Sequence, residues 1–208
     1  MAETVIRDDM MVRNKLKIRV VGGGWYGCHH ALYFKERGHN VTLVEKEDAI
    51  FQGASGRNQS RLHLGFHYPR SDVTRVASRA GVDEFRRTYP SLCRSVACNI
   101  YAVAQNSLID FQTYLHVMRG TGSPFFEIKP EDFGLTNLEG AVQCGEYLIL
   151  HDRAKVFFEQ YLKDEINVGV IADPSENDDY DFTIDCTFGA MGAEGIDVYE
   201  PCVMHKYR

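Results

Sequence analysis

The chain has 208 residues, of which 44% are hydrophobic and 25% are charged, and its net charge is −6. This composition supports a globular core and argues against wholesale disorder. An acidic chain without a basic stripe is a poor nucleic-acid binder, and no apolar run approaches the roughly 20 residues of a membrane helix. We therefore expect no nucleic-acid partner and no membrane partner.

The first residues, Met1 to Asp9, lack the apolar segment of a secretory signal. The six cysteines are scattered without a C-x-x-C pair, which is typical of reduced thiols, so a cytoplasmic protein is expected. A local basic cluster inside this acidic chain favours a small anionic ligand over a polyanion. Its members are Arg57, Arg61, Arg70, Arg75 and Arg79.

The first elements in chain order form a β-α-β pattern. Lys17 to Val21 is a β-branched run that predicts a strand, and residues 22–24 form a turn. Trp25 to Arg37 carries apolar residues at helical spacing and meets Gly38 at the usual C-terminal stop position. Val41 to Glu45 is a second strand, and the alternation predicts a parallel sheet.

The middle of the chain changes character. Polar, glycine-rich Gln52 to Arg61 predicts a loop, and Ser71 to Arg87 predicts a helix with Ser71 or Asp72 as N-cap. An α+β segment with an antiparallel sheet follows. Its predicted elements are a strand over Val96 to Val103, a helix over Leu108 to Met118, and strands over Phe125 to Ile128 and Ala141 to Leu150.

Helix and strand then alternate again. We expect a helix over Arg153 to Ile166 with Asp152 as N-cap, a strand over Val168 to Ala172, an acidic loop over Asp173 to Asp181 and a strand over Phe182 to Cys186. The predicted fold is α/β. A Rossmann-type domain with a parallel sheet covers residues 15–90 and 151–190, and an inserted α+β domain covers 91–150 and 191–208, incomplete at the C-terminus.

Three glycines carry the first chemical signal. Gly22-x-Gly24-x-x-Gly27 follows a predicted strand and opens a predicted helix, which is the context of a dinucleotide-binding turn. Gly22 permits the tight turn, Gly24 lets a pyrophosphate approach the backbone, and Gly27 lets helix and strand pack closely. The helix N-terminus offers free N–H groups to the phosphates.

Glu45 ends the second strand about 20 residues later, where an acidic side chain accepts hydrogen bonds from a ribose. A carboxylate there disfavours the 2′-phosphate of NADP. An NAD-binding domain would continue with another helix and strand, whereas here polar, glycine-rich residues 52–68 follow. FAD is therefore the predicted cofactor, and an NAD-dependent dehydrogenase is the less favoured alternative.

At VVGGGWYGCHHALYFKERGHNVTLVEKE and GASGRNQSRLHLGFHYP, the chain resembles the D-amino-acid oxidase and glycerol-3-phosphate dehydrogenase superfamily of FAD enzymes, especially its 2-hydroxyglutarate dehydrogenase branch. A weaker similarity is DFTIDCTFG at Asp181 to Gly189. Relatives in this superfamily continue beyond the point that matches Tyr199 to Arg208, so the chain is expected to be short at its C-terminus. A homo-oligomer or a partner chain that completes the fold is therefore also expected.

The resemblance implies a set of cofactor contacts. Contacts to the pyrophosphate or the ribityl chain are implied for Ser55, Arg57, Asn58 and Gln59. Arg61, Leu62, His63 and Leu64 would run toward the flavin ring, and Val168 to Ile171, with Val170, would line the adenine pocket. The predicted cofactor-binding set is completed by Trp25, Tyr26, Lys46 and Gly189.

His63, His67 and Arg61 are the candidate catalytic residues. Either histidine could polarise a substrate, take a proton or carry a covalent flavin, and the alternative is a structural, hydrogen-bonded histidine. As a metal pair they are poor, because no third ligand lies nearby in sequence, so no metal is predicted. Arg61 is the candidate cation near the flavin, while Tyr68 and Arg70 are weaker candidates for holding a substrate anion.

These residues favour an FAD-dependent oxidoreductase that removes hydride from a small amine, amino-acid or 2-hydroxy-acid substrate. A nucleotide-binding or scaffolding protein that has lost turnover is the alternative, because the expected substrate domain is incomplete.

Overall fold

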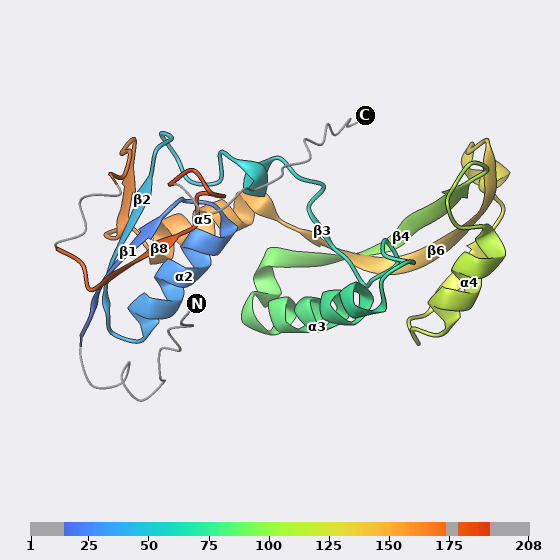
Figure 1. Ribbon diagram of the computed structural model, residues 1–208, viewed down its shortest axis with the longest axis horizontal. Helices are drawn as coiled ribbons and strands as arrows, with labels where there is room; N and C mark the ends of the chain where they lie inside the picture. The colour runs from blue at the N-terminus through green and yellow to red at the C-terminus, as the bar shows by residue number, and fades with distance from the viewer. Residues whose placement is uncertain (1–14, 174–178, 192–208) are drawn as a thin grey trace. The chain divides into compact units, whose positions relative to one another are not determined.

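The computed structural model describes residues 15–173 and 179–191, which form two compact units (Figure 1). The first unit joins the segment that ends at Asn58 to the segment that begins at His151, and the second runs from Gln59 to Leu150. One unit contains a parallel sheet and the other an antiparallel sheet, both with helices. The predicted fold class is thereby confirmed.

The sheet of the first unit has four parallel strands in the order β7-β2-β1-β8. Its strands are β1 (Lys17–Val21), β2 (Asn40–Glu45), β7 (Ile166–Val168) and β8 (Phe182–Asp185). Most of the apolar side chains of the two central strands are buried, with Ile18, Val20 and Leu43 fully inaccessible. Because all four strands run the same way, their carboxyl ends meet at one edge.

Two helices complete the first unit. Helix α2 (Trp25–Glu36) packs on β1 and β2, and α5 (His151–Tyr161) lies beside α2. Trp25, the first residue of α2, makes edge-to-face contacts with Phe51 and with Phe158 of α5, at centroid distances of 5.4 and 5.6 Å. These aromatic contacts fix the start of α2 directly after the glycine turn.

The second unit is built on an antiparallel sheet in the order β3-β6-β4, with β5 also paired to β6. Its core gathers Phe66, Tyr114, Leu115, Met118 and Val142. The regular elements of this unit are β3 (Arg61–Leu62), α3 (Asp72–Thr88), β4 (Cys93–Ala104), α4 (Phe111–Arg119), β5 (Phe125–Ile128) and β6 (Leu138–Ile149), with 3-10 turns η2 (Pro90–Leu92) and η3 (Pro130–Phe133).

Two predicted elements after residue 150 differ from the structure. Helix α5 ends at Tyr161, and Ile166, expected in that helix, opens β7 instead. The amide of Leu43 in β2 donates to the Glu165 carbonyl, so pairing with the sheet replaces a further helical turn. The expected strand over Val168 to Ala172 ends at Val168, because Gly169 adopts a left-handed φ of +70°.

Helix α4 begins three residues later than predicted. Asp110 is its N-cap, with one carboxylate oxygen accepting from the Thr113 amide at 2.8 Å and the other from the Thr113 hydroxyl at 2.7 Å. Leu108, expected on the apolar face, lies before the cap and is 87% exposed. A strong local cap therefore overrides the apolar spacing.

The boundary between the units also differs from the expected one. Residues 59–90, expected in the first domain, belong to the second unit, because β3 pairs with β6 and the Ile149 amide donates to the Ser60 carbonyl. The expected elements at 174–178 and at 192–208, including Tyr199 to Arg208, lie outside the described residues.

Candidate active site

The glycine turn between β1 and α2 requires two of its glycines for packing. Gly22 has φ +105°, and a Cβ there would lie 2.6 Å from the Cys186 carbonyl oxygen. A Cβ on Gly27 would overlap the Gly22 carbonyl oxygen. The first turn of α2 therefore rests directly on the backbone that leaves β1, as the motif implies.

Gly24 is different, because its position is open on most sides. A Cβ there would meet only the Ser55 side chain, with the hydroxyl oxygen at 3.0 Å. Ser55, in the 3-10 turn η1 (Ala54–Gly56), accepts a hydrogen bond from the Trp25 amide at 2.8 Å. The first-turn amides of a helix have no intrahelical acceptor and carry partial positive charge. Ser55 already accepts from the Trp25 amide, so the backbone at Gly24 and Tyr26 is the part of this turn suited to an anion.

Glu45 stands at the carboxyl end of β2, beside this turn. One carboxylate oxygen accepts from the Gly23 amide at 2.6 Å and the other from the Glu47 amide at 3.0 Å. Each oxygen keeps a further lone pair that can accept from a hydroxyl. The Val170 amide donates to the Glu45 carbonyl at 3.0 Å, which brings Val170 next to this strand end. Lys46 is exposed.

The loop after β2 is held to the start of α5. Asn58 Oδ1 lies 3.1 Å from His151 Nε2, and the His151 ring contacts Phe51 edge-on. His151 was not among the predicted site residues, since nothing near it in sequence marks it. Arg57 and Gln59 are exposed, so their side chains are accessible to a ligand.

Beyond β8, a second turn starts from the same sheet edge as the glycine turn. The Cys186 amide donates to the Val21 carbonyl at 2.8 Å. One Asp185 carboxylate oxygen then accepts from the Thr187 amide and hydroxyl, at 2.8 and 2.6 Å. Gly189 has φ +82° and follows exposed Phe188, which also has a positive φ.

These features can be compared with what the binding of a dinucleotide requires. Phosphate recognition needs a backbone position open to a close approach and a helix N-terminus, and both are present at Gly24. Ribose recognition needs a carboxylate at a strand end about 20 residues later, which Glu45 supplies. The residues of the first unit therefore fit the ADP portion of FAD.

The catalytic candidates lie in the second unit. Arg61 and Leu62 form β3 and pair with Leu148 and Tyr147 of β6. His63 follows directly, and its ring stacks on that of His67 at 5.5 Å, with His67 exposed. Within the described residues, no three His, Cys, Asp or Glu side chains gather as metal ligands.

A buried carboxylate lies behind His63 that the sequence prediction missed. Glu146 is 1% exposed and accepts hydrogen bonds from the Leu64 amide at 2.8 Å, the Tyr101 hydroxyl at 2.8 Å and the Asn99 side-chain amide at 3.2 Å. His63 Nδ1 lies 3.0 Å from the Tyr101 oxygen and 3.5 Å from a Glu146 oxygen. The available signal was alternation in β6, which puts Glu146 on the buried face with Val142 and Cys144.

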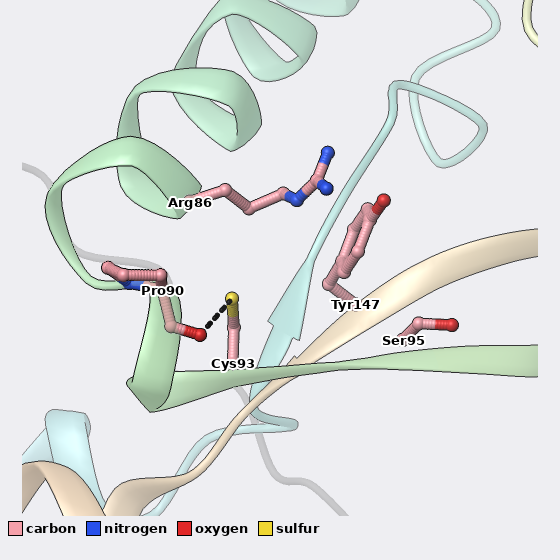
Figure 2. Close-up of a pocket in the computed structure, with 5 residues that line it drawn as sticks. All are labelled: Arg86, Pro90, Cys93, Ser95 and Tyr147. Carbon is pink, nitrogen blue, oxygen red and sulfur yellow. Dashed lines mark hydrogen bonds between the residues drawn. The ribbon is translucent and has the colours of Figure 1, made fainter.

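An open pocket in the second unit lies elsewhere (Figure 2). The Arg86 guanidinium stands 4.4 Å from the centroid of the Tyr147 ring, and no carboxylate lines the pocket among the described residues. Its lining residues are Arg86, Pro90, Cys93, Ser95 and Tyr147. The predicted site residues do not contribute to it, so we do not assign it to the cofactor.

A family model, DAO, described as FAD dependent oxidoreductase, matches residues 17–154. The chain belongs to this family of FAD-dependent oxidoreductases, which confirms the predicted resemblance and, at the level of the family, the predicted cofactor. The described residues contain no helix of the length and apolar character needed to cross a membrane.

Two curated relatives of the chain are both named as FAD-dependent monooxygenases. The chain is 39% identical over 196 residues to the FAD-dependent monooxygenase FPY4 of Fusarium mangiferae, covering 89% of this chain and 53% of that protein. It is 48% identical over 93 residues to the FAD-dependent monooxygenase kojA of Aspergillus flavus, covering 45% and 22%. The chain thus spans about half the length of the first relative and less of the second.

Solved structures with the same fold share little sequence. L-alpha-glycerophosphate oxidase from Mycoplasma pneumoniae with FAD bound has a TM-score of 0.58 at 16% identity, covering 74% of this chain and 44% of that one. Glycine oxidase from Bacillus cereus has a TM-score of 0.53 at 19% identity, covering 74% and 47%. These similarities establish the fold.

Proposed function

We propose that the chain binds FAD and oxidises a small substrate whose reacting carbon bears an amine or a hydroxyl group. The observation that carries this proposal is the cradle made by Gly24, the start of α2 and Glu45 in a member of an FAD-dependent family. When bound, FAD supplies the acceptor for two electrons delivered as hydride.

The residues of the first unit would hold the ADP portion. The pyrophosphate would lie against Gly24 and the Tyr26 amide at the start of α2, while the Trp25 amide stays bonded to Ser55. Gly22 and Gly27 would serve the packing of this turn. Glu45 would accept from the ribose, with Lys46 and Val170 beside it. The loop residues that remain proposed cofactor contacts are Ser55, Arg57, Asn58 and Gln59, with Gly189 in the turn after β8.

The residues of the second unit would serve the substrate. His63, polarised by Glu146 and Tyr101, would take the proton of the substrate hydroxyl or amine. Arg61 would supply a positive charge toward the flavin, and Leu62 an apolar contact. His67 is more exposed than His63 and is the second candidate for the proton.

Monooxygenation is the second candidate, favoured by the names of the two curated relatives. It inserts one oxygen atom of O₂ into the substrate, reduces the other to water and consumes two electrons from a separate reductant. An oxidase instead passes the electrons of the substrate to O₂ and releases hydrogen peroxide. Mass spectrometry of products formed under ¹⁸O₂ separates the two, because only monooxygenation labels the organic product.

The first test of the proposal is an FAD titration of the Gly24→Ala variant. The added methyl group meets only the flexible Ser55 side chain, so the fold should persist, while the approach of the pyrophosphate to the backbone is blocked. Loss of a hydrogen bond to a charged group costs about 1.5–3 kcal/mol, so we expect the Kd to rise roughly ten- to hundredfold.

The matched control is Gly81→Ala, which lies within α3 and whose Cβ meets nothing within 4 Å. It should bind FAD like the parent chain. Titration followed by flavin fluorescence and visible absorption gives the affinities. Equal affinity in Gly24→Ala and the parent chain, or no FAD binding by the parent chain, would contradict the proposed cofactor site.

A further inference from the structure

The environment of His63 determines which of its ring nitrogens carries a proton. Its Nδ1 faces two oxygens, the Tyr101 hydroxyl at 3.0 Å and a Glu146 carboxylate oxygen at 3.5 Å. The Tyr101 hydroxyl donates its one proton to the same Glu146 oxygen at 2.8 Å. Both neighbours therefore present lone pairs to Nδ1, so Nδ1 must be the donor.

The other contacts of Glu146 and Tyr101 keep this arrangement rigid. Glu146 also accepts from the Leu64 amide and the Asn99 side-chain amide, so both of its oxygens are fixed in the buried interior. The Tyr101 ring stacks on Phe66 with centroids 5.8 Å apart. Burial, together with the Glu146 carboxylate, raises the pKa of the Tyr101 phenol, which therefore keeps its proton.

We infer that Glu146 and Tyr101 are positioning residues that hold neutral His63 in the Nδ1-protonated tautomer and leave Nε2 as its basic nitrogen. The inference rests on the proposed function, in which His63 takes a proton from the substrate. In that reaction the substrate O–H or N–H bond would break and its proton would go to Nε2, and FAD, when bound, would supply the acceptor for the hydride of the adjacent carbon. The imidazolium that results keeps its Nδ1–H toward the Glu146 carboxylate, which offsets the new charge.

The test is ¹⁵N NMR of the histidine side chains in the 208-residue chain, which reads the protonation of each ring nitrogen without substrate or FAD. His63→Asn identifies the signals of His63 by their loss. We expect protonated Nδ1 and unprotonated Nε2 in the parent chain. Tyr101→Phe and Glu146→Gln should each move His63 toward a mixture of both tautomers.

Tyr114→Phe is the matched control, because it removes another buried phenol hydroxyl from the same core, one that donates to the Phe66 carbonyl at 3.1 Å. It should leave the His63 signals unchanged. An Nε2-protonated His63 in the parent chain overturns the inference, as does an unchanged tautomer in both Tyr101→Phe and Glu146→Gln. Failure to bind FAD overturns the proposed function and leaves the tautomer result intact, so the two failures are distinguishable.

Discussion

At the scale of single residues, the described cysteines differ in their access to solvent. Cys98 is exposed, whereas Cys28 and Cys144 are 0% and 3% exposed. Burial raises the pKa of the Cys28 thiol and raises that of Cys144 to about 12. Since the thiolate is the reactive form, both buried thiols are protected by access and by protonation.

Among the cysteines that the structure describes, we expect iodoacetamide at about pH 8 to alkylate Cys98 first and to leave Cys28 and Cys144 unmodified in the folded chain. The thiolate fraction of Cys144 rises about tenfold per pH unit below its raised pKa, so alkaline pH should increase its labelling. Peptide mass spectrometry gives the order, with a denatured sample as control. Early labelling of Cys144 would show that the core of the second unit is not packed as described.

How far individual residues could be predicted depends on whether their role is local. Gly22, Gly27 and Glu45 are set by a β-α-β unit within 29 residues of chain, so spacing alone locates them at one strand edge. Glu146 contacts His63, which follows β3, and Asn99 and Tyr101, which both lie on β4. No local pattern joins such residues, and only sheet pairing brings them together.

At the scale of elements, two helices of the second unit begin at side-chain caps. Ser71 accepts from the Thr74 amide at 3.3 Å to start α3, and Asp110 caps α4 through Thr113. Hydrogen bonds from the Thr113 hydroxyl and amide lower the pKa of the exposed Asp110 carboxyl. The stabilisation from this cap is therefore complete above the ordinary Asp pKa and is lost as the pH falls through the lowered value.

Removing each cap should have a distinct pH signature. We expect Ser71→Ala to cost about 1 kcal/mol at any pH. Asp110→Ala should lower the melting temperature near neutral pH, and its difference from the parent chain should vanish in acid. Thermal unfolding followed by circular dichroism across pH measures both. A difference for Asp110→Ala that persists in acid would mean that the carboxylate is not the cap.

The boundaries of helices and strands could be predicted from the sequence only where local residues determine them. Strand β1 and strand β5 match their predicted ranges because each is bounded by local turn residues. The predicted end of α5 was wrong because β7 pairs with β2, and this pairing determines where the helix ends. The two paired segments lie over 120 residues apart in the sequence. Tertiary pairing of this kind overrides local helix propensity.

At the scale of the whole molecule, the proposed FAD contacts follow the division into units. Those to the ADP portion, at Gly24, Glu45 and Ser55, lie in the first unit, while Arg61 and His63 lie in the second. The chain crosses from one unit to the other between Asn58 and Gln59, inside the very loop that the resemblance assigns to the pyrophosphate and ribityl chain. Protection by a ligand can therefore be measured separately in each unit.

Hydrogen exchange with two ligands can test this division. ADP should slow exchange only in the first unit, at residues 22–27 and 45–47, because it lacks the flavin and ribityl chain. FAD should protect the same residues and, in addition, residues 59–64 of the second unit. Mass spectrometry of peptides from the two complexes gives both patterns. If FAD protects no more than ADP does, Arg61 and His63 do not approach the flavin, and the substrate proton would need another acceptor. If FAD adds protection at residues 59–64, the flavin end of the ligand affects the segment in which His63 contacts Tyr101 and Glu146.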